Sequence, residues 1–193
     1  MVGKKTCDKD QVIEKSMRLF WKKGYQGTTL SELTEVTGLQ KGSLYGTFHS
    51  KEHLFRLSLQ RYGERMRKTF ISDECPFDYL KTFFSELISE GVSGEAKYGC
   101  LIMNSTQEFG EKRGHKSLLA HSLFLELYQN FERTLDIALE RNLLPKRFDK
   151  KACSDRLIGA AFSIRELSKF RKDEELFVNI ASGVLKDLDI SLN

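Results

Sequence analysis

One stretch of the sequence gathers side chains that can bind a polyanion. Lys41 and Lys51 carry ammonium groups, and Thr29, Ser43 and Tyr45 carry hydroxyl groups. Lysine reaches the acceptor atoms of guanine or a phosphate oxygen, and hydroxyl groups donate to phosphates. Glycines among these residues let the backbone come close to a bound strand. We therefore predict a set of contacts to double-stranded DNA, made up of Thr29, Ser31, Lys41, Gly42, Ser43, Tyr45, Gly46, Thr47 and Lys51.

The net charge of the chain is unevenly distributed. All of the formal +4 lies in residues 1–60, which hold ten Lys or Arg against six Asp or Glu, whereas residues 61–193 hold 21 of each. This asymmetry is expected when one end of a chain meets a polyanion and the other does not. A solvated basic surface has the same composition, so the charge supports the DNA prediction without establishing it.

The predicted contact residues lie where short helices are expected. Apolar residues at helical spacing predict a first helix over residues 8–23. Thr29 and Glu32 form a capping box that begins a second helix. A third helix, over residues 41–48, follows after a three-residue turn that begins with glycine. Two short helices joined in this way are typical of a helix-turn-helix, whose second helix enters the major groove.

Three of the aromatic and basic residues in this region also have a structural interpretation. Phe48 is predicted to lie in the core. Tyr45 either packs in the core or faces DNA, and Lys51 either begins a solvated helix or contacts a phosphate. Because Tyr45 and Lys51 flank the turn on its exposed side, the DNA role is favoured for both.

The rest of the chain has the apolar periodicity of long helices. The sequence contains only two prolines, so long helices are permitted almost throughout. We predict an all-α fold of about nine helices, with a helix-turn-helix domain over residues 1–50 and a second helical domain over residues 51–193. The later helices are predicted over residues 51–70, 76–91, 100–109, 115–141, 149–170 and 173–188.

Several classes of protein have no support in the sequence. It has neither a membrane-spanning apolar run nor a secretory signal, which favours a cytoplasmic protein with reduced cysteines. The four cysteines form no CxxC pair, so no metal and no cofactor are predicted. Catalytic Ser/His/Asp sets and phosphate-binding glycine loops are missing, which argues against an enzyme. A purely architectural DNA binder would have little use for the electrically neutral residues 61–193.

Residues 28–54, TTLSELTEVTGLQKGSLYGTFHSKEHL, resemble the signature of the tetracycline-repressor (TetR) family, and the likeness extends over about residues 8–60. The sequence departs from the family pattern in three places. Leu33-Thr34 stands in place of Ile-Ala, and Thr37 stands in place of the Ala before Gly. These two changes affect packing. Thr47 replaces the usual Tyr or His at a contact position, so the family's operator sequences do not carry over.

The resemblance implies an architecture and a mode of action. Members of the family are all-helical homodimers whose last two helices pair into a four-helix bundle, here through about residues 149–188. Their middle helices enclose a ligand pocket, and a bound ligand spreads the two recognition helices out of register with successive major grooves. The resemblance thus implies a DNA-binding regulator, most often a repressor that a small-molecule inducer releases from a palindromic operator. Residues 51–193 would then sense the ligand and form the dimer.

Residues 99–108, GCLIMNSTQE, resemble the G-C-L-x-x-N-x-x-x-E motif of one TetR subgroup. Some members of that subgroup respond to electrophiles or oxidants through cysteine, and others bind small organic ligands. Cys100 lies at a predicted helix N-terminus, where a thiolate is more available, and Lys169 is a candidate neighbour. A redox- or electrophile-sensing repressor is therefore the alternative function. A small buried apolar role is the other interpretation of Cys100.

The pocket residues are predicted from an apolar stripe at helical spacing. Such a stripe fits a protein core as well as it fits a ligand pocket. The predicted pocket or sensor residues are Cys100, Leu101, Asn104, Phe124, Tyr128, Phe131 and Phe162.

Overall fold

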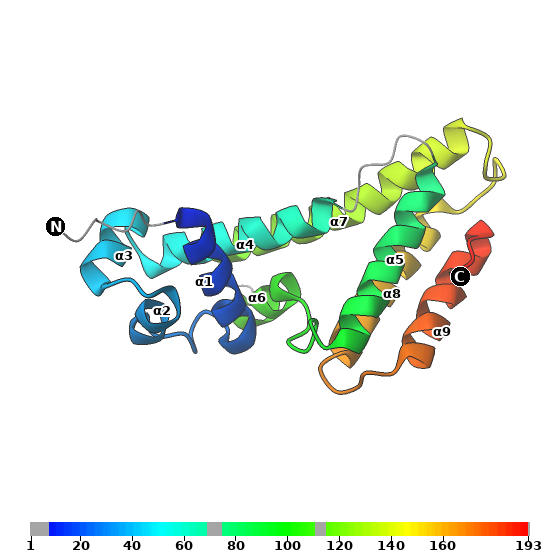
Figure 1. Ribbon diagram of the computed structural model, residues 1–193. Helices are drawn as coiled ribbons and strands as arrows, with labels where there is room; N and C mark the ends of the chain where they lie inside the picture. The colour runs from blue at the N-terminus through cyan, green and yellow to red at the C-terminus, as the bar shows by residue number, and fades with distance from the viewer. Residues whose placement is uncertain (1–7, 69–74, 111–114, 193) are drawn as a thin grey trace. The chain divides into compact units, whose positions relative to one another are not determined.

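The computed structural model describes residues 8–68, 75–110 and 115–192 (Figure 1). The described residues form nine α-helices, one short 3-10 helix and no strands, which confirms the predicted all-α fold. The helices are α1 (Lys9–Lys23), α2 (Leu30–Thr37), α3 (Lys41–Phe48), α4 (Lys51–Lys68), α5 (Pro76–Ser93), α6 (Leu101–Phe109), α7 (His115–Glu140), α8 (Lys150–Leu167), α9 (Glu174–Leu185) and η1 (Lys186–Leu188).

Local capping interactions determine where several of these helices begin. At α2, the Thr29 side chain accepts a hydrogen bond from the Glu32 amide while the Glu32 carboxylate accepts one from the Thr29 amide, so the predicted capping box is present. The carboxylates of Asp149 and Asp173 cap α8 and α9. Each cap satisfies amides that have no partner inside the helix. These signals lie within four residues of sequence, which explains why the starts were predictable.

Contacts divide the chain into two compact units. One unit comprises Met1–Glu64 with Leu101–His121, and the other comprises Arg65–Cys100 with Ser122–Asn193. This partition follows packing, and the functional division at residue 50 stays a prediction.

The first unit holds α1, α2 and α3 around an aromatic core. Phe20 and Phe55 meet edge to face with 5.0 Å between ring centroids, and both are fully buried. Trp21 packs against Tyr62 in the same geometry at 5.1 Å. These pairs join α1 to α4, and α1 packs against α2, which in turn packs against α3. Short helices such as α2 and α3 are marginal in isolation and depend on such contacts.

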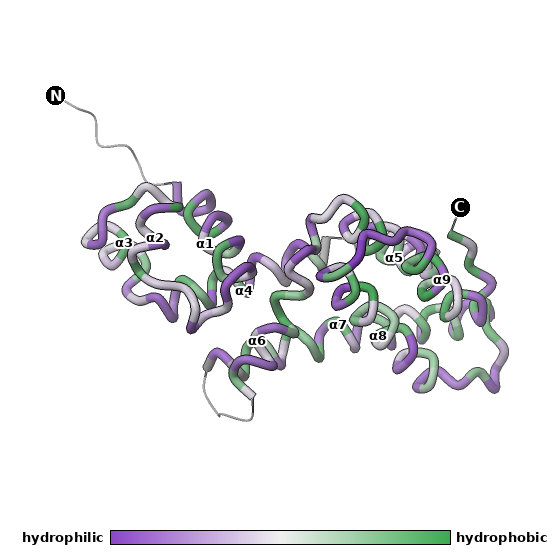
Figure 2. The backbone as a smooth tube through the Cα atoms, turned by 90° about the horizontal axis from the view of Figure 1, so that it is seen from below, coloured by the Kyte–Doolittle hydropathy of each residue, from purple (hydrophilic) through white to green (hydrophobic). Residues whose placement is uncertain are grey.

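The second unit is built on α5, α8 and α9, which lie side by side in both views (Figures 1 and 2). Their hydrophobic positions recur along each helix and form one core together with α7; Phe84 of α5, Phe131 of α7 and Phe177 of α9 are among its fully buried side chains. At Gly91, an added Cβ would lie 2.7 Å from the Phe177 ring. Gly91 therefore allows α5 and α9 to pack closely.

None of the described helices is both long enough and apolar enough to cross a membrane. The described residues also contain no group of three His, Cys, Asp or Glu side chains that could hold a metal ion.

Candidate functional site

Helix α3 presents one buried face and one exposed face. Leu44 and Phe48 are only 3% and 2% exposed, which confirms the prediction that Phe48 lies in the core. On the other face, Lys41 and Ser43 are exposed, and Tyr45 is 41% exposed. This exposure of a large aromatic side chain fits a DNA contact better than a core position, because tyrosine at an interface keeps its hydroxyl free for a partner.

Two glycines open the same face of α3. At Gly42 and at Gly46, an added Cβ would meet no atom within 4 Å. The backbone is therefore accessible at two points one helical turn apart. Thr47, which completes the predicted contact residues of this helix, is half-buried.

The start of α2 is a dense local network. Lys23 pairs with Glu32, and the Thr29 hydroxyl donates to the same carboxylate at 2.8 Å. The hydrogen bond from Lys23, followed by those from Thr29, lowers the pKa of Glu32 from 4.5 to about 2. Thr29 and Ser31 are both exposed at this end of the helix. Thr29 and Ser31 thus lie at a capped helix N-terminus, and their phosphate contacts stay predictions.

Lys51 is engaged within the protein. Its Nζ donates to the carbonyl oxygen of Thr28 at 2.6 Å and lies 4.3 Å from the centroid of the Tyr25 ring. Burial lowers the pKa of this half-buried lysine, while the nearby Glu108 carboxylate raises it. The ammonium group has three hydrogens, so it can donate to the Thr28 carbonyl and still donate to a phosphate. The phosphate contact of Lys51 therefore stays a prediction beside this structural role.

The sequence interpretation missed Tyr25, Glu108 and Lys116, which surround Lys51. Glu108 accepts hydrogen bonds from the amides of Tyr25 and Gln26, and the Lys116 ammonium also lies over the Tyr25 ring. The one available signal was the position of Glu108 at the end of the G-C-L-x-x-N-x-x-x-E motif. Nothing in local sequence indicates a contact across 83 residues.

Cys100 is buried, with 2% of its surface exposed, and directly precedes α6. An added Cβ at Gly99 would collide with Cε of Lys169 and lie 3.0 Å from its Nζ. The structure therefore brings Lys169 beside Gly99, the residue that precedes Cys100, and a contact between Lys169 and the Cys100 thiol stays a prediction. Lys169 Nζ also donates to Glu166 at 2.7 Å.

The other described cysteines differ in their surroundings. Cys75 and Cys153 are free thiols, as is Cys100, and Cys7 lies outside the described residues. Burial raises the pKa of the Cys153 thiol to about 11. This thiol therefore stays protonated near neutral pH, which disfavours reaction.

The predicted aromatic pocket residues occupy different surroundings. Phe124 and Phe162 stack with 5.4 Å between centroids, and both are half-buried. Phe131 is fully buried in the core, 5.2 Å from the Phe83 ring. The Tyr128 hydroxyl donates to Asp155 at 2.8 Å, at the surface of the unit. Phe124, Phe162 and Tyr128 are thus half-buried, whereas Phe131 is part of the core.

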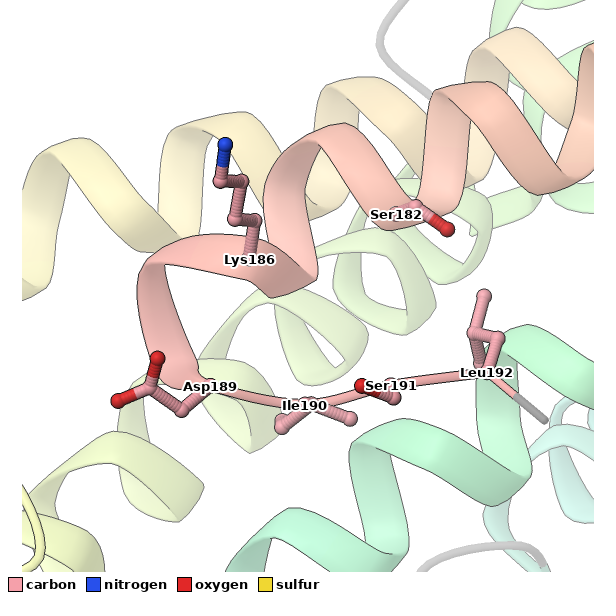
Figure 3. A pocket seen from close by; sticks show the side chains of 6 residues that line it. All are labelled: Ser182, Lys186, Asp189, Ile190, Ser191 and Leu192. Atoms are coloured by element: carbon pink, nitrogen blue, oxygen red, sulfur yellow. The ribbon is translucent and has the colours of Figure 1, made fainter.

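Of the remaining predicted pocket residues, Leu101 is buried and Asn104 is half-buried, and both lie on α6. A separate open pocket of about 430 Å³ lies at the C-terminal end of α9 (Figure 3). Its lining comes from α9, η1 and the residues that follow, and includes none of the predicted pocket residues. The lining residues are Ser182, Lys186, Asp189, Ile190, Ser191 and Leu192.

Comparisons with known proteins agree with the helix-turn-helix. Residues 12–57 match the family described as "Bacterial regulatory proteins, tetR family". The chain is 35% identical over 131 residues to the biofilm operon negative transcriptional regulator IcaR of Staphylococcus aureus, covering 65% of this chain and 70% of IcaR. It is 33% identical over 106 residues to the transcriptional repressor ComR of Escherichia coli, and this match spans 52% of the chain and only 50% of ComR.

Solved structures share the fold over nearly the whole chain. A TetR regulator from Chloroflexus aurantiacus has a TM-score of 0.81 at 19% identity, covering 95% of this chain and 94% of its own. A cysteine mutant of CifR, solved with operator DNA, has a TM-score of 0.79 at 22% identity, covering 97% and 98%. AibR, solved with isovaleryl coenzyme A and operator DNA, has a TM-score of 0.66 at 18% identity, covering 92% and 96%.

The fold and the exposed face of α3 define a helix-turn-helix regulator. The chain belongs to the TetR family of bacterial regulatory proteins and is a DNA-binding transcriptional regulator.

Proposed function

We propose that this protein is a repressor that binds a palindromic operator as a homodimer and is released by a small-molecule inducer. The observation that carries the proposal is the exposed face of α3, where Lys41, Ser43 and Tyr45 lie around two open glycines above the buried Leu44 and Phe48. A helix buried on one side and polar on the other is what a recognition helix requires. The related IcaR and ComR are named as negative regulators, which supports repression.

The predicted contact residues would bind two parts of the DNA, the base edges and the phosphates. Lys41 would reach guanine acceptors or a phosphate, and the hydroxyls of Ser43 and Tyr45 would donate to phosphates. Thr29 and Ser31 would add contacts at the N-terminus of α2, where the helix dipole favours an anion. Gly42, Gly46 and Thr47 would allow close approach, and Lys51 would contact the next phosphate. Binding to chromosomal DNA would place the protein in the cytoplasm.

Two protomers would pair through about residues 149–188. The buried Phe177 and Ala181 belong to the core of the protomer, whereas Phe162, Ile180 and Val184 are apolar side chains left half-buried on α8 and α9. Burying such surfaces against a second copy is favourable. A two-fold axis through this bundle would place two α3 helices on the two halves of a palindrome.

The test is binding to a fluorescent duplex from immediately upstream of the protein's own gene, followed by anisotropy. Wild-type protein should bind tightly, and affinity should fall steeply as salt rises. Replacement Lys41→Met should weaken binding about 5- to 150-fold, the range of a lost base or phosphate contact. Lys97→Met, at an exposed lysine of the second unit, removes the same charge and is the control. Equal affinities for the two variants would contradict the assignment of α3 as the recognition helix.

A thiol-sensing version of the repressor is the second candidate, favoured by the position of Lys169 beside Gly99, the residue that precedes Cys100. The resemblance to the G-C-L-x-x-N-x-x-x-E subgroup supports it. An aromatic disulfide would form a bond to Cys100 Sγ while its other sulfur leaves as a thiolate, and a reductant would reverse the exchange. The Cys100→Ser variant should then bind the same duplex but ignore the disulfide, whereas Cys75→Ser should still respond. Wild-type binding that is indifferent to the reagent would contradict thiol sensing by Cys100 and direct the search for the inducer to small organic ligands.

A further inference from the structure

A cluster of charges surrounds the turn between α1 and α2, and its central member is Glu108 of α6. The Tyr25 amide donates to Oε2 of Glu108 at 2.8 Å, and the Gln26 amide donates to Oε1 at 2.6 Å. One carboxylate thus binds two successive backbone amides. Hydrogen bonds to an ionised acceptor are roughly twice as strong as those between neutral groups.

The carboxylate lies directly against the backbone of the turn. Gly24 has φ of +74°, and an added Cβ there would lie 2.9 Å from Oε2 of Glu108. Glycine at this position is therefore required both by the left-handed backbone and by the close approach of the carboxylate. The backbone of the turn and the Glu108 carboxylate therefore pack directly against each other.

Two lysines complete the cluster around the Tyr25 ring. The ammonium groups of Lys51 and Lys116 each lie 4.3 Å from its centroid, within the range of a cation–π interaction. Lys116 also pairs with Glu52 at 3.1 Å. The cluster thus contains two lysines and the two carboxylates of Glu52 and Glu108, and its formal net charge is zero.

The turn leads directly into the DNA-facing helices. Thr28 is buried, its hydroxyl donates to the Gly24 carbonyl at 2.6 Å, and its own carbonyl accepts from Lys51. The next residue, Thr29, is the N-cap of α2. A change in the turn would therefore move the N-terminus of α2, and α3 with it, because only a short turn joins the two helices.

We propose that Glu108 is a positioning residue for operator binding, whose carboxylate holds the α1–α2 turn so that α2 and α3 match the DNA. This inference rests on the proposed function. Helix α6 begins directly after Cys100 and carries Glu108 in its last turn. The motif that contains the candidate sensor therefore also contains the residue that holds the DNA-binding helices.

If only charge mattered, removing the Glu108 carboxylate would strengthen DNA binding, whereas the proposed positioning role predicts weaker binding to the operator. A protein with one negative charge fewer should bind DNA more tightly. Glu108→Gln removes the charge, keeps the size of the side chain and leaves one oxygen for two amides. Glu64→Gln, at an exposed glutamate of α4 in the same unit, makes the same change of charge and is the matched control.

The full-length variants are compared on the operator duplex and on a scrambled duplex of equal length. Glu108→Gln should bind the operator at least about tenfold more weakly than Glu64→Gln, which corresponds to roughly 1.4 kcal/mol. Binding of the two variants to the scrambled duplex should be the same. Hydrogen exchange should quicken at the amides of Tyr25 and Gln26 in Glu108→Gln, while the circular dichroism spectrum stays unchanged.

Equal operator affinities of Glu108→Gln and Glu64→Gln, with specific binding by the wild type, would overturn this inference alone. Absence of specific binding by the wild type to the upstream duplex would remove autoregulation, and absence of any specific duplex after selection from random DNA would overturn the proposed function as well. If Glu108→Gln does not fold, Lys116→Gln tests the same cluster against Lys97→Gln. The Lys116 variant should bind the operator about two- to fivefold more weakly than its control, the loss expected for a cation–π contact, and equal affinities would overturn the inference.

Discussion

At the scale of single residues, Glu32 is the acid whose environment is most clearly changed by the fold. Hydrogen bonds from Lys23 and Thr29 lower its pKa from 4.5 to about 2. Because the folded pKa lies below the ordinary value, the carboxylate stabilises the fold above about pH 4.5, and that contribution is lost as the pH falls toward 2. The start of α2 should therefore stay formed in moderate acid.

We expect the side-chain carboxyl of Glu32 to titrate by NMR with a midpoint near pH 2. In the Lys23→Met variant, the midpoint should rise, because the largest cause of the lowered pKa has been removed. A wild-type midpoint near 4.5 would show that the network at the N-terminus of α2 is not formed in solution.

At the scale of helices, Gly91 and Gly159 look equivalent in sequence but differ in surroundings. Both lie within helices, where alanine is favoured over glycine by about 0.5–1 kcal/mol. At Gly159, nothing lies within 4 Å of an added Cβ, whereas at Gly91 the added atom would lie 2.7 Å from Phe177 and 2.8 Å from Ser168 Oγ. Packing therefore opposes helix propensity at one site and leaves it unopposed at the other.

Gly159→Ala should accordingly raise the free energy of unfolding by about 0.5–1 kcal/mol. Gly91→Ala should lower it by about 1–3 kcal/mol, the usual cost of inserting an atom into a packed core. Urea denaturation followed by circular dichroism measures both. Stabilisation by Gly91→Ala would mean that α5 and α9 are not in close contact in solution.

At the scale of the whole molecule, one aromatic residue of the predicted ligand pocket lies instead in the core of the second unit. Phe131 was predicted as a pocket residue, and the structure buries it completely against Phe83 and Tyr79. A side chain in that position contributes to stability through close packing. Its replacement should therefore affect stability first.

Phe131→Ala should lower the free energy of unfolding by about 3–5 kcal/mol, since it removes a buried ring and leaves a cavity. Leu143→Ala is the control, because this side chain is 47% exposed and lies outside residues 149–188, and its loss should change stability by less than about 0.5 kcal/mol. Similar results for the two variants would show that Phe131 faces an open pocket.

The helices and the DNA-binding class were predictable from sequence because their signals are local. The Thr29–Glu32 capping box and the caps at Asp149 and Asp173 join residues at most three apart. The predicted start of α2 and both predicted bounds of α3 agree with the structure. The helix over residues 149–170 ends earlier, at Leu167, because Ser168–Phe170 tighten into a turn with hydrogen bonds such as that from the Phe170 amide to the Leu167 carbonyl.

The sequence by itself determined the all-α class, the helix-turn-helix and the exposed residues of α3, since periodicity, caps and the family signature are all written along the chain. Only the tertiary structure decided which aromatic residues fill the core, that Lys51 binds Thr28, and that Glu108 holds the turn at Tyr25. The physical reason is that these features depend on residues far apart along the chain. An apolar stripe has the same spacing whether it lines a core or a pocket, and the sequence around a carboxylate does not indicate which distant amides it will bind in the folded chain.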